Sequence, residues 1–199
     1  MKLYLNKTSP YARLVMIVAH EKGLAGKIEL AWTDPWASPA DLVAVNPYSR
    51  VPALVTDDGA TLLESGCIAD YLDEIAGGTP LTPARGAARL RALRKSGLGR
   101  GLIEAAFGVT IQRRFHGDGG ELATRWLTAV NRATRELERD AGLLSTNGAV
   151  DMGDLTVAVG LTYTEFRLPE VKWKSISPGL STWLAHVTAR PSMRATAPE

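Results

Sequence analysis

The segment 50–66, RVPALVTDDGATLLESG, constrains the fold more than any other part of the chain. Residues 53–56 and 61–63 form two short apolar runs, which predict two strands. Asp58-Gly59 between them predicts a tight two-residue hairpin turn, because glycine adopts positive φ at little cost. A helix is expected to open directly afterwards, with Ser65 capping its free main-chain amides. The segment therefore predicts a β-hairpin that leads straight into a helix.

Pro52 limits where the first of these strands begins. Proline cannot donate a ladder hydrogen bond, so Pro52 belongs at the first residue of its strand or at an edge. Val51 should then lie where sheet pairing has not begun, with its N–H and C=O groups free. The helix N-terminus that follows favours a carboxylate. Free extended backbone beside such a helix start predicts a site for a peptide-like, negatively charged ligand.

Composition limits the classes of protein that fit. The chain has 199 residues, enough for one large domain or two small ones, with 45% apolar and 22% charged residues as in soluble globular proteins. No apolar run reaches about 18 residues, and the N-terminal run is too short for a secretory signal. A single cysteine, Cys67, excludes an internal disulfide. We therefore expect a cytoplasmic protein without a membrane span.

Charge divides the chain into two parts. The first 78 residues carry 6 Lys and Arg against 10 Asp and Glu, whereas the remainder carries 17 against 11. The sign changes within AGGTPLTP, residues 76–83, which has the composition of a linker. We predict a domain at 1–78, a linker at 79–83 and a second domain at 84–199. The net charge of +2 and the lack of an interleaved aromatic platform argue against nucleic-acid binding.

The first half alternates strands and helices. Residues 2–5 and 28–31 predict strands. Between them, Ser9-Pro10 predicts a helix start with serine as cap and proline at the first helical position. The resulting β-α-β unit should be right-handed with parallel strands. A short helical piece at 39–45, the hairpin and the helix from Ser65 then complete an α/β domain with the order β-α-β-α-β-β-α.

The second half predicts helices alone and therefore an all-α helical bundle. Residues 84–114 form one helix, or two helices broken near 97–101. Further helices are expected at 119–141, 152–166 and 178–188. Asp151 and Asp154 stand three apart at the start of the 152–166 helix, as in a capping box.

Together these patterns resemble the glutathione transferase family, whose first domain is thioredoxin-like and whose second is helical. The most specific motifs are Val51-Pro52-Ala53-Leu54 and Glu64-Ser65 at the family's spacing. Ser9-Pro10-Tyr11 and Asn46-Pro47 support them in the first half. Asp151-Met152-Gly153-Asp154-Leu155 and Ala189-Arg190-Pro191-Ser192 support them in the second.

The resemblance implies a binding site for glutathione, used as a co-substrate. Pro52 would be the family's cis-proline, and the Val51 main chain would pair with the cysteinyl part of the ligand. Ser65, with Glu64, would hold the γ-glutamyl end on the helix N-terminus. Arg50 would approach the glycyl end.

Ser9 stands where family members place the residue that activates the thiol. The reaction needs a thiolate, and the pKa of a free thiol, about 8.5, falls near hydrogen-bond donors and helix N-termini. Ser9 would stabilise that charge rather than attack the substrate. A helix cap without a catalytic role remains an alternative for Ser9, and Thr8 is a competing activator.

Other residues receive weaker assignments. The resemblance suggests an electrophile pocket that includes Tyr11, Phe107, Ile111 and Arg114. Arg100 stands where relatives carry an acid that reaches the partner subunit's glutathione, and Glu104 follows one turn later. Cys67 is expected to be a small core residue. We expect Trp126, Trp173 and Trp183 in the core or an interface. Trp32 and Trp36 are placed in the loop after the second strand, where a position lining the ligand cleft is one alternative. A solvated face explains the basic residues of the 84–114 helix, which are Arg85, Arg89, Arg91, Arg94, Lys95, Arg113 and Arg114.

The sequence thus predicts a cytoplasmic, homodimeric glutathione transferase that adds glutathione to small hydrophobic electrophiles, as in detoxification. Two alternatives remain open, a glutathione-dependent peroxidase or disulfide reductase, and a non-catalytic protein-binding module. No metal site is expected, since His20, His116 and His186 are too scattered in the sequence.

Overall fold

The computed structural model describes residues 1–145 and 149–198 and forms two compact units. One unit comprises Met1–Pro80 and Pro191–Glu199, and the other is Leu81–Arg190. The predicted second domain, 84–199, therefore differs at its end, because the last residues join the first unit. That predicted domain also spans residues 146–148 and 199, which lie outside the described residues.

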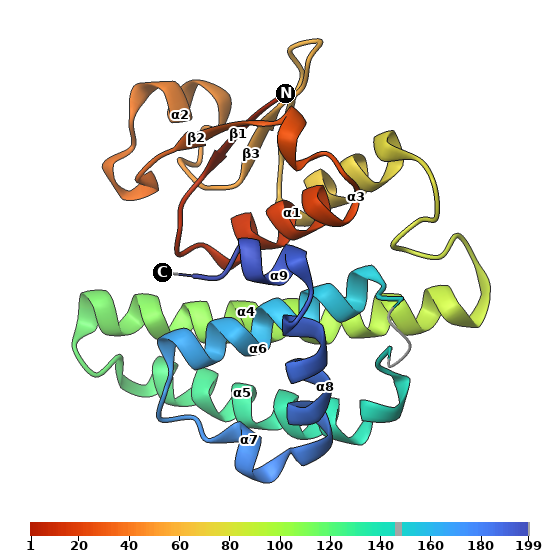
Figure 1. Ribbon diagram of the computed structural model, residues 1–199. Helices are drawn as coiled ribbons and strands as arrows, with labels where there is room; N and C mark the ends of the chain where they lie inside the picture. The colour runs from red at the N-terminus through yellow and green to blue at the C-terminus, as the bar shows by residue number, and fades with distance from the viewer. Residues whose placement is uncertain (146–148, 199) are drawn as a thin grey trace. The chain divides into compact units, whose positions relative to one another are not determined.

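The first unit is built on a four-stranded sheet with the order β2-β1-β3-β4 (Figure 1). Its strands are β1 (Lys2–Leu5), β2 (Glu29–Trp32), β3 (Ala53–Val55) and β4 (Thr61–Leu63). Strand β1 pairs in parallel with β2 and antiparallel with β3, which in turn pairs antiparallel with β4. The sheet is the predicted mixed one, with β2 one residue later than predicted and β3 one residue shorter.

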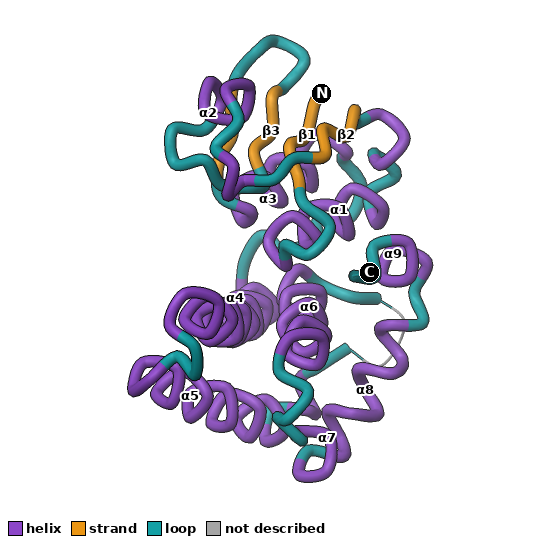
Figure 2. Tube along the Cα trace, turned by 90° about the vertical axis from the view of Figure 1, so that its left-hand side faces the viewer, coloured by secondary structure: helices purple, strands orange, loops and turns teal. Residues whose placement is uncertain are grey.

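Helices cover both faces of this sheet. The α-helices of the first 80 residues are α1 (Pro10–Glu21), α2 (Ala40–Val45) and α3 (Ser65–Ala76), and two 3-10 helices lie at Ala25–Lys27 and Pro35–Ala37. Helices α1 and α3 pack side by side on one face, and α2 lies on the other (Figures 1 and 2). Side chains alternate between the faces, so Tyr4 and Ala53 pack against Leu42 of α2, whereas the buried Leu3 and Leu54 point to the opposite face. This is a thioredoxin-like arrangement.

The end of the chain belongs to the first unit because it packs on α1. Helix α9 (Pro191–Ala195) contacts α1. The Arg13 guanidinium donates to the Met193 carbonyl at 3.3 Å, and the Ser192 hydroxyl donates to the Glu21 carboxylate. Both ends of the chain therefore contribute to this unit.

The described part of the second unit is helical. Its main helices are α4 (Gly86–His116), α5 (Gly120–Arg139), α6 (Met152–Arg167), α7 (Trp173–Ile176) and α8 (Pro178–Thr188). Four of these were predicted within a few residues, but α7, like α9, was not. Trp173 and Trp183 are buried in this unit, as expected, and Trp126 is half-buried.

Helix α4 runs without a break through the glycines at 97–101, so the break that the sequence suggested does not occur. Gly99 packs against the backbone of α6, where a Cβ atom would lie 2.7 Å from Thr156 C and Val157 N. A Cβ at Gly160 on α6 would lie 3.0 Å from the Gly99 carbonyl oxygen. At these positions glycine allows two helices to approach closely.

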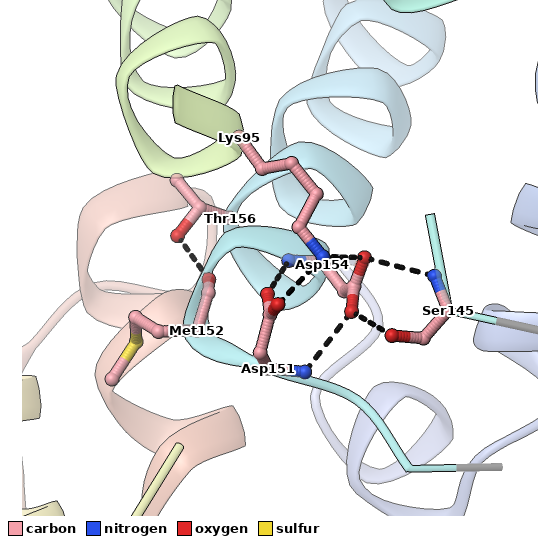
Figure 3. Close-up of polar contacts among 6 residues, drawn as sticks. All are labelled: Lys95, Ser145, Asp151, Met152, Asp154 and Thr156. Carbon is pink, nitrogen blue, oxygen red and sulfur yellow. Dashed lines mark hydrogen bonds and ion pairs between the residues drawn. The ribbon is translucent and has the colours of Figure 1, made fainter. Parts of the chain in front are cut away.

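The predicted capping box at the start of α6 is present (Figure 3). Asp154 N–H donates to Asp151 Oδ1 at 2.9 Å, and Asp151 N–H donates to Asp154 Oδ2 at 3.0 Å. Lys95 of α4 lies against both carboxylates, with its Nζ 2.6 Å from Asp151 and 2.8 Å from Asp154. The prediction of a solvated Lys95 is therefore wrong, since this side chain is buried in an ion-pair cluster.

Within the described residues, no helix is both long enough and apolar enough to cross a bilayer.

Candidate functional site

The register of the sheet brings three loop segments to one end of the first unit. Tyr4 of β1 lies opposite Ala53 of β3, which lies opposite Leu63 of β4. The chain that leaves β1 toward Ser9, the chain that enters β3 from Val51 and the chain that leaves β4 at Glu64 therefore meet at the same edge. The sequence named all three segments, but their proximity follows from the strand pairing.

Ser9 begins α1 at this edge. Its backbone is extended, and its Oγ accepts a hydrogen bond from Ala12 N–H at 3.2 Å, so the predicted N-cap is present. An oxygen that accepts still has its own proton to donate. Among residues 1–145 and 149–198, no acceptor binds the Ser9 hydroxyl proton. The half-buried Ser9 hydroxyl can therefore still donate a hydrogen bond, and it lies at the N-terminus of α1.

The neighbouring hydroxyl of Thr8 has a different environment. Both the main-chain N–H and the hydroxyl of Thr8 donate to Asn6 Oδ1, each at 3.0 Å. The Asn6 side-chain amide donates in turn to the Thr33 carbonyl at 3.1 Å. The Thr8 proton is thus used within the loop, which sets Thr8 apart from Ser9.

Val51 precedes the sheet, as the sequence predicted. The Val51-Pro52 peptide bond is cis, and ladder pairing begins only at Ala53. In the part of the chain that the structure describes, the Val51 N–H and C=O groups make no hydrogen bond. The loop before Val51 is fixed by buried Asn46, which donates to the Arg50 carbonyl at 2.8 Å. That role of Asn46 was not recognised from the sequence, although it follows from the preference of asparagine for side-chain to backbone bonds in turns.

The hairpin and the start of α3 form the other side of the site. The hairpin loop has three residues instead of the predicted two, because Thr56 N–H donates to the Ala60 carbonyl and Gly59 adopts φ 85°. Ser65 is the first residue of α3, so the predicted capping role is wrong and Glu64 occupies the cap position. Ser65 is buried, whereas Glu64 is exposed.

Glu64 has φ 65°, a left-handed conformation that costs a residue other than glycine on the order of 1–3 kcal/mol. Strand β4 before it and α3 after it hold this conformation. Such strain is concentrated at ligand-binding sites, where the surrounding structure fixes a side chain or an amide in position.

The chemistry of this edge favours a bound anion. Helices α1 and α3 both begin here, and the partial positive charge of a helix N-terminus stabilises carboxylates and thiolates. The unpaired backbone of Val51 lies between them and can pair with an extended ligand. The edge therefore combines strand-like pairing for a peptide with two positions suited to negative charge.

The four residues predicted for the electrophile pocket fall in different units. Tyr11 is half-buried on α1, whereas Phe107, Ile111 and the exposed Arg114 lie on α4. A groove of about 640 Å³ in the second unit has a different lining. Its residues are Leu98, Arg132, Ala133, Arg135, Glu136 and Arg139. The predicted pocket thus remains a prediction, and this groove does not coincide with it.

The expectation that Cys67 is a core residue is wrong. It is exposed on α3 instead of lying in the core, because the buried face of that helix runs through Ile68, Ala69 and Leu72. Trp32 and Trp36 are also exposed, with 57% and 48% of their surface accessible. The described residues contain no group of three or more potential metal ligands.

Comparison with known proteins shows the family of this chain. The glutathione S-transferase N-terminal domain family matches residues 8–75. The crystal structure of a glutathione transferase family member from Pseudomonas fluorescens Pf-5, with bound glutathione, is 33% identical. That alignment covers 100% of this chain and 98% of the other, with a TM-score of 0.90. A second structure of a family member from that strain contains S-(propanoic acid)-glutathione and is 32% identical to this chain, with a TM-score of 0.86. That alignment covers 100% of both chains.

Curated relatives give a more varied set of names. A stringent starvation protein A homolog from Pasteurella multocida (strain Pm70) is 42% identical over 98 residues, 47% of this chain and 45% of that protein. The chain thus spans about half the length of that relative. The uncharacterized GST-like protein YibF from Escherichia coli (strain K12) is 27% identical over 202 residues, covering 100% of this chain and 98% of YibF.

A thioredoxin-like unit joined to a helical unit is a two-domain class of fold, and the structure shows this class for the chain. Within that class, the chain belongs to the glutathione transferase family.

Proposed function

We propose that this protein is an enzyme that binds glutathione and transfers it, as the thiolate, to small hydrophobic electrophiles. The observation that carries the proposal is the Ser9 hydroxyl, whose proton has no acceptor within the described residues. Ser9 also begins α1, so the hydroxyl and the helix N-terminus act on the same position. Together they would favour a thiolate over a thiol.

The energy that this requires is moderate. Lowering the pKa of a thiol from about 8.5 by roughly 2 units favours the thiolate by about 2.7 kcal/mol. One hydrogen bond to a charged group contributes about 1.5–3 kcal/mol, and a helix terminus adds about 0.3–1 kcal/mol. Ser9 would thus stabilise the sulfur charge, and the sulfur would attack the electrophile.

The remaining site residues would hold the tripeptide. The free main chain of Val51, next to Pro52, would pair with the cysteinyl residue. Ser65 and the start of α3 would hold the γ-glutamyl carboxylate, and the exposed Glu64 would face its ammonium group. Arg50, also exposed, would approach the glycyl carboxylate. Glutathione bound to the 33% identical relative from Pseudomonas fluorescens supports this assignment.

Substituting Ser9 tests the catalytic assignment. We expect Ser9→Ala to bind glutathione about as tightly as the wild type in calorimetry. Its turnover with a chromogenic electrophile near pH 7 should fall roughly tenfold or more, because less of the bound thiol is ionised. A direct thiol titration of the bound glutathione should show the corresponding rise in pKa.

Thr8→Val is the matched control, since the Thr8 hydroxyl is already bound to Asn6. It should leave turnover and the thiol pKa nearly unchanged. A fully active Ser9→Ala variant would disprove the catalytic role of Ser9. Absence of glutathione binding at millimolar concentration would disprove the function itself.

We also propose a homodimer in the cytoplasm, a compartment that suits a chain with one free cysteine. One face of α4 is exposed over several turns and combines apolar side chains, glycines and two charged side chains. Leu90 and Leu93 are 70% and 48% exposed on this face. We call it the α4 exposed face, and its residues are Leu90, Leu93, Gly97, Arg100, Gly101 and Glu104.

A second candidate function is a non-catalytic protein-binding module. Arg100, exposed on α4 where the resemblance leads us to expect an acid, favours it. Glu104 is exposed one turn later and is suited to the acidic role if the protein is an enzyme. The calorimetric titration separates the two, because the module would not need to bind glutathione.

A further inference from the structure

The groove of the second unit lies between two helices that run side by side. Helices α4 and α5 pack against each other within the unit Leu81–Arg190 (Figures 1 and 2). Both helices supply its lining, which is Leu98 of α4 and Arg132, Ala133, Arg135, Glu136 and Arg139 of α5. A volume of about 640 Å³ is that of a pocket for a small organic ligand. None of the lining residues belongs to the α4 exposed face, where we place the dimer contact.

Two carboxylates at this groove are already neutralised by two arginines. Arg94 Nη2 donates to Glu136 Oε1 at 2.7 Å, and Arg139 pairs with the other oxygen of the same carboxylate. Arg94 Nε donates to Asp140 Oδ2 at 2.8 Å. Glu138 is bound elsewhere, because its carboxylate accepts from two main-chain N–H groups at the start of α8. The two positive and two negative charges of the Arg94 network therefore cancel.

Arg132 and Arg135 carry the charge that this network leaves over. Both side chains are exposed, and neither guanidinium makes an ion pair or a hydrogen bond with a described residue. Residues three apart are neighbours on a helix surface, with Cβ atoms about 5–6 Å apart, so both side chains can reach one bound group. Each guanidinium is planar and binds phosphate or carboxylate oxygens with two parallel hydrogen bonds. The groove thus holds two uncompensated positive charges that one dianion can neutralise.

The groove also offers apolar surface to a ligand. Leu98 and Ala133 are half-buried in its lining. The methylene stems of the arginines add further apolar surface beneath their charged ends. An inorganic ion would leave this surface in contact with water, whereas an anion with a ring or a short hydrocarbon body would cover it. The lining therefore favours an organic anion over an inorganic one.

We propose that the groove between α4 and α5 binds a small soluble organic phosphate, with Arg132 and Arg135 on its phosphate group and Leu98 and Ala133 against its apolar body. A phosphate monoester carries a charge of about −1.5 to −2 at pH 7 and three acceptor oxygens, which suits two guanidinium groups. A sulfate ester or a monocarboxylate brings a single negative charge and would leave one arginine uncompensated. The groove belongs wholly to the second unit, so binding does not require glutathione.

Phenyl phosphate, phenyl sulfate and inorganic phosphate are the probes of this groove. Calorimetry with the intact protein measures all three, with and without millimolar glutathione. We expect phenyl phosphate to bind roughly tenfold more tightly than phenyl sulfate, which has the same body and about one charge fewer. It should also bind roughly fivefold more tightly than inorganic phosphate, which lacks the body. Glutathione should leave these affinities unchanged.

Variants locate the phosphate group on α5. Arg132→Gln and Arg135→Gln should each weaken phenyl phosphate binding by roughly tenfold, and because both residues are exposed the variants should fold normally. Arg125→Gln is the matched control, since Arg125 is an exposed arginine about two turns before Arg132 and does not line the groove. It removes the same charge and should leave the affinity unchanged. The methyl resonances of Leu98 and Ala133 should shift during an NMR titration with phenyl phosphate.

Equal affinities for phenyl phosphate and phenyl sulfate would overturn the proposal, as would equal effects of Arg132→Gln and Arg125→Gln. Unmoved methyl resonances of Leu98 and Ala133, or competition by glutathione, would place the phosphate elsewhere and would also overturn it. Binding to vesicles that contain phosphatidic acid, without binding of phenyl phosphate, would assign the arginines to a membrane surface instead. Failure of this groove would leave the proposed transferase activity untouched, because that activity is measured by glutathione binding and turnover.

Discussion

Ser9 and Thr8 show how neighbouring hydroxyls acquire different chemistry. Both stand before α1, and both are plausible thiol activators from the sequence. The loop distinguishes them, because Asn6 accepts the Thr8 proton while Ser9 accepts from Ala12 and keeps its own proton. A role as helix cap and a role as hydrogen-bond donor are therefore compatible in Ser9.

Lys95 carries a buried charge between two carboxylates. Its side chain is 5% exposed and that of Asp154 is 0% exposed. Asp154 also accepts from the Ser145 hydroxyl at 2.6 Å (Figure 3). Burial of an ion pair costs desolvation energy, which only good geometry and additional hydrogen bonds offset. This cluster fulfils both conditions, and it ties α4 to the start of α6.

We expect Lys95→Met to lower the free energy of unfolding by about 3–5 kcal/mol, because it leaves a buried carboxylate without its partner. Urea denaturation measures the loss. Arg94→Met is the matched control, since Arg94 pairs with Glu136 and Asp140 at the surface and such pairs contribute about 0–1 kcal/mol. Equal losses for the two variants would show that the Lys95 cluster does not stabilise the fold.

Close approach of α4 and α6 depends on glycine at the contact. Gly99 and Gly160 face each other across the two helices, and Gly153 lies where a Cβ would come within 2.5 Å of the Lys95 Cβ. Elsewhere on α4, Gly97 and Gly101 face open space. The sequence suggested that the glycines at 97–101 break the helix. In the structure, Gly99 instead lies in the close contact that joins α4 to α6.

We expect Gly99→Ala to destabilise the protein by about 1–3 kcal/mol, since its methyl group overlaps the backbone of α6. In the monomeric chain, at a protein concentration below that of self-association, Gly101→Ala should instead stabilise the fold by about 0.5–1 kcal/mol, because its Cβ meets open space and alanine favours an exposed helix interior. Thermal or urea unfolding at one protein concentration compares them. A neutral Gly99→Ala variant would contradict the tight helix contact.

The proposed dimer gives a prediction for the assembly. Leu93→Asp on the α4 exposed face should weaken self-association by roughly a hundredfold or more. Burial of a leucine contributes about 1.5–3 kcal/mol and counts twice in a two-fold interface. Sedimentation velocity at micromolar concentration measures the change.

Ile176→Asp on α7 is the control for this experiment, because Ile176 has the same 48% exposure as Leu93 but lies on another helix. It should leave self-association intact. A wild-type protein that sediments as a monomer would disprove the dimer. Equal effects of the two variants would show that the interface does not lie on the α4 exposed face.

The first unit draws on both ends of the chain. Residues 1–80 supply the sheet and three α-helices, and Pro191–Glu199 returns to pack on α1. Sequence reasoning assigned this last segment to the helical domain, because local patterns carry no information about which surface a short terminal helix will cover. The contacts of Arg13 with Met193 and of Ser192 with Glu21 determine its place.

Local chemistry in the sequence was sufficient for most of the elements. Turn glycines, the Ser9-Pro10 helix start, the paired aspartates at 151 and 154 and the position of Pro52 each act within a few residues, so their structural roles could be predicted. The burial of charged or small side chains could not, because it depends on segments far apart in the chain. Tertiary structure alone buried Lys95, exposed Cys67 and kept α4 unbroken at Gly99.

The candidate site, too, combines features that the sequence predicted with an arrangement that only the tertiary structure determined. The sequence predicted that the Val51 main chain lies beside the helix start at Ser65, and the family resemblance added Ser9 and Glu64 to the same site. Only the pairing of β1 with β3 and of β3 with β4 brought them to one edge of a sheet. Strand register is a long-range property, set by which side chains two distant segments bury together, and that is why it had to come from the folded structure.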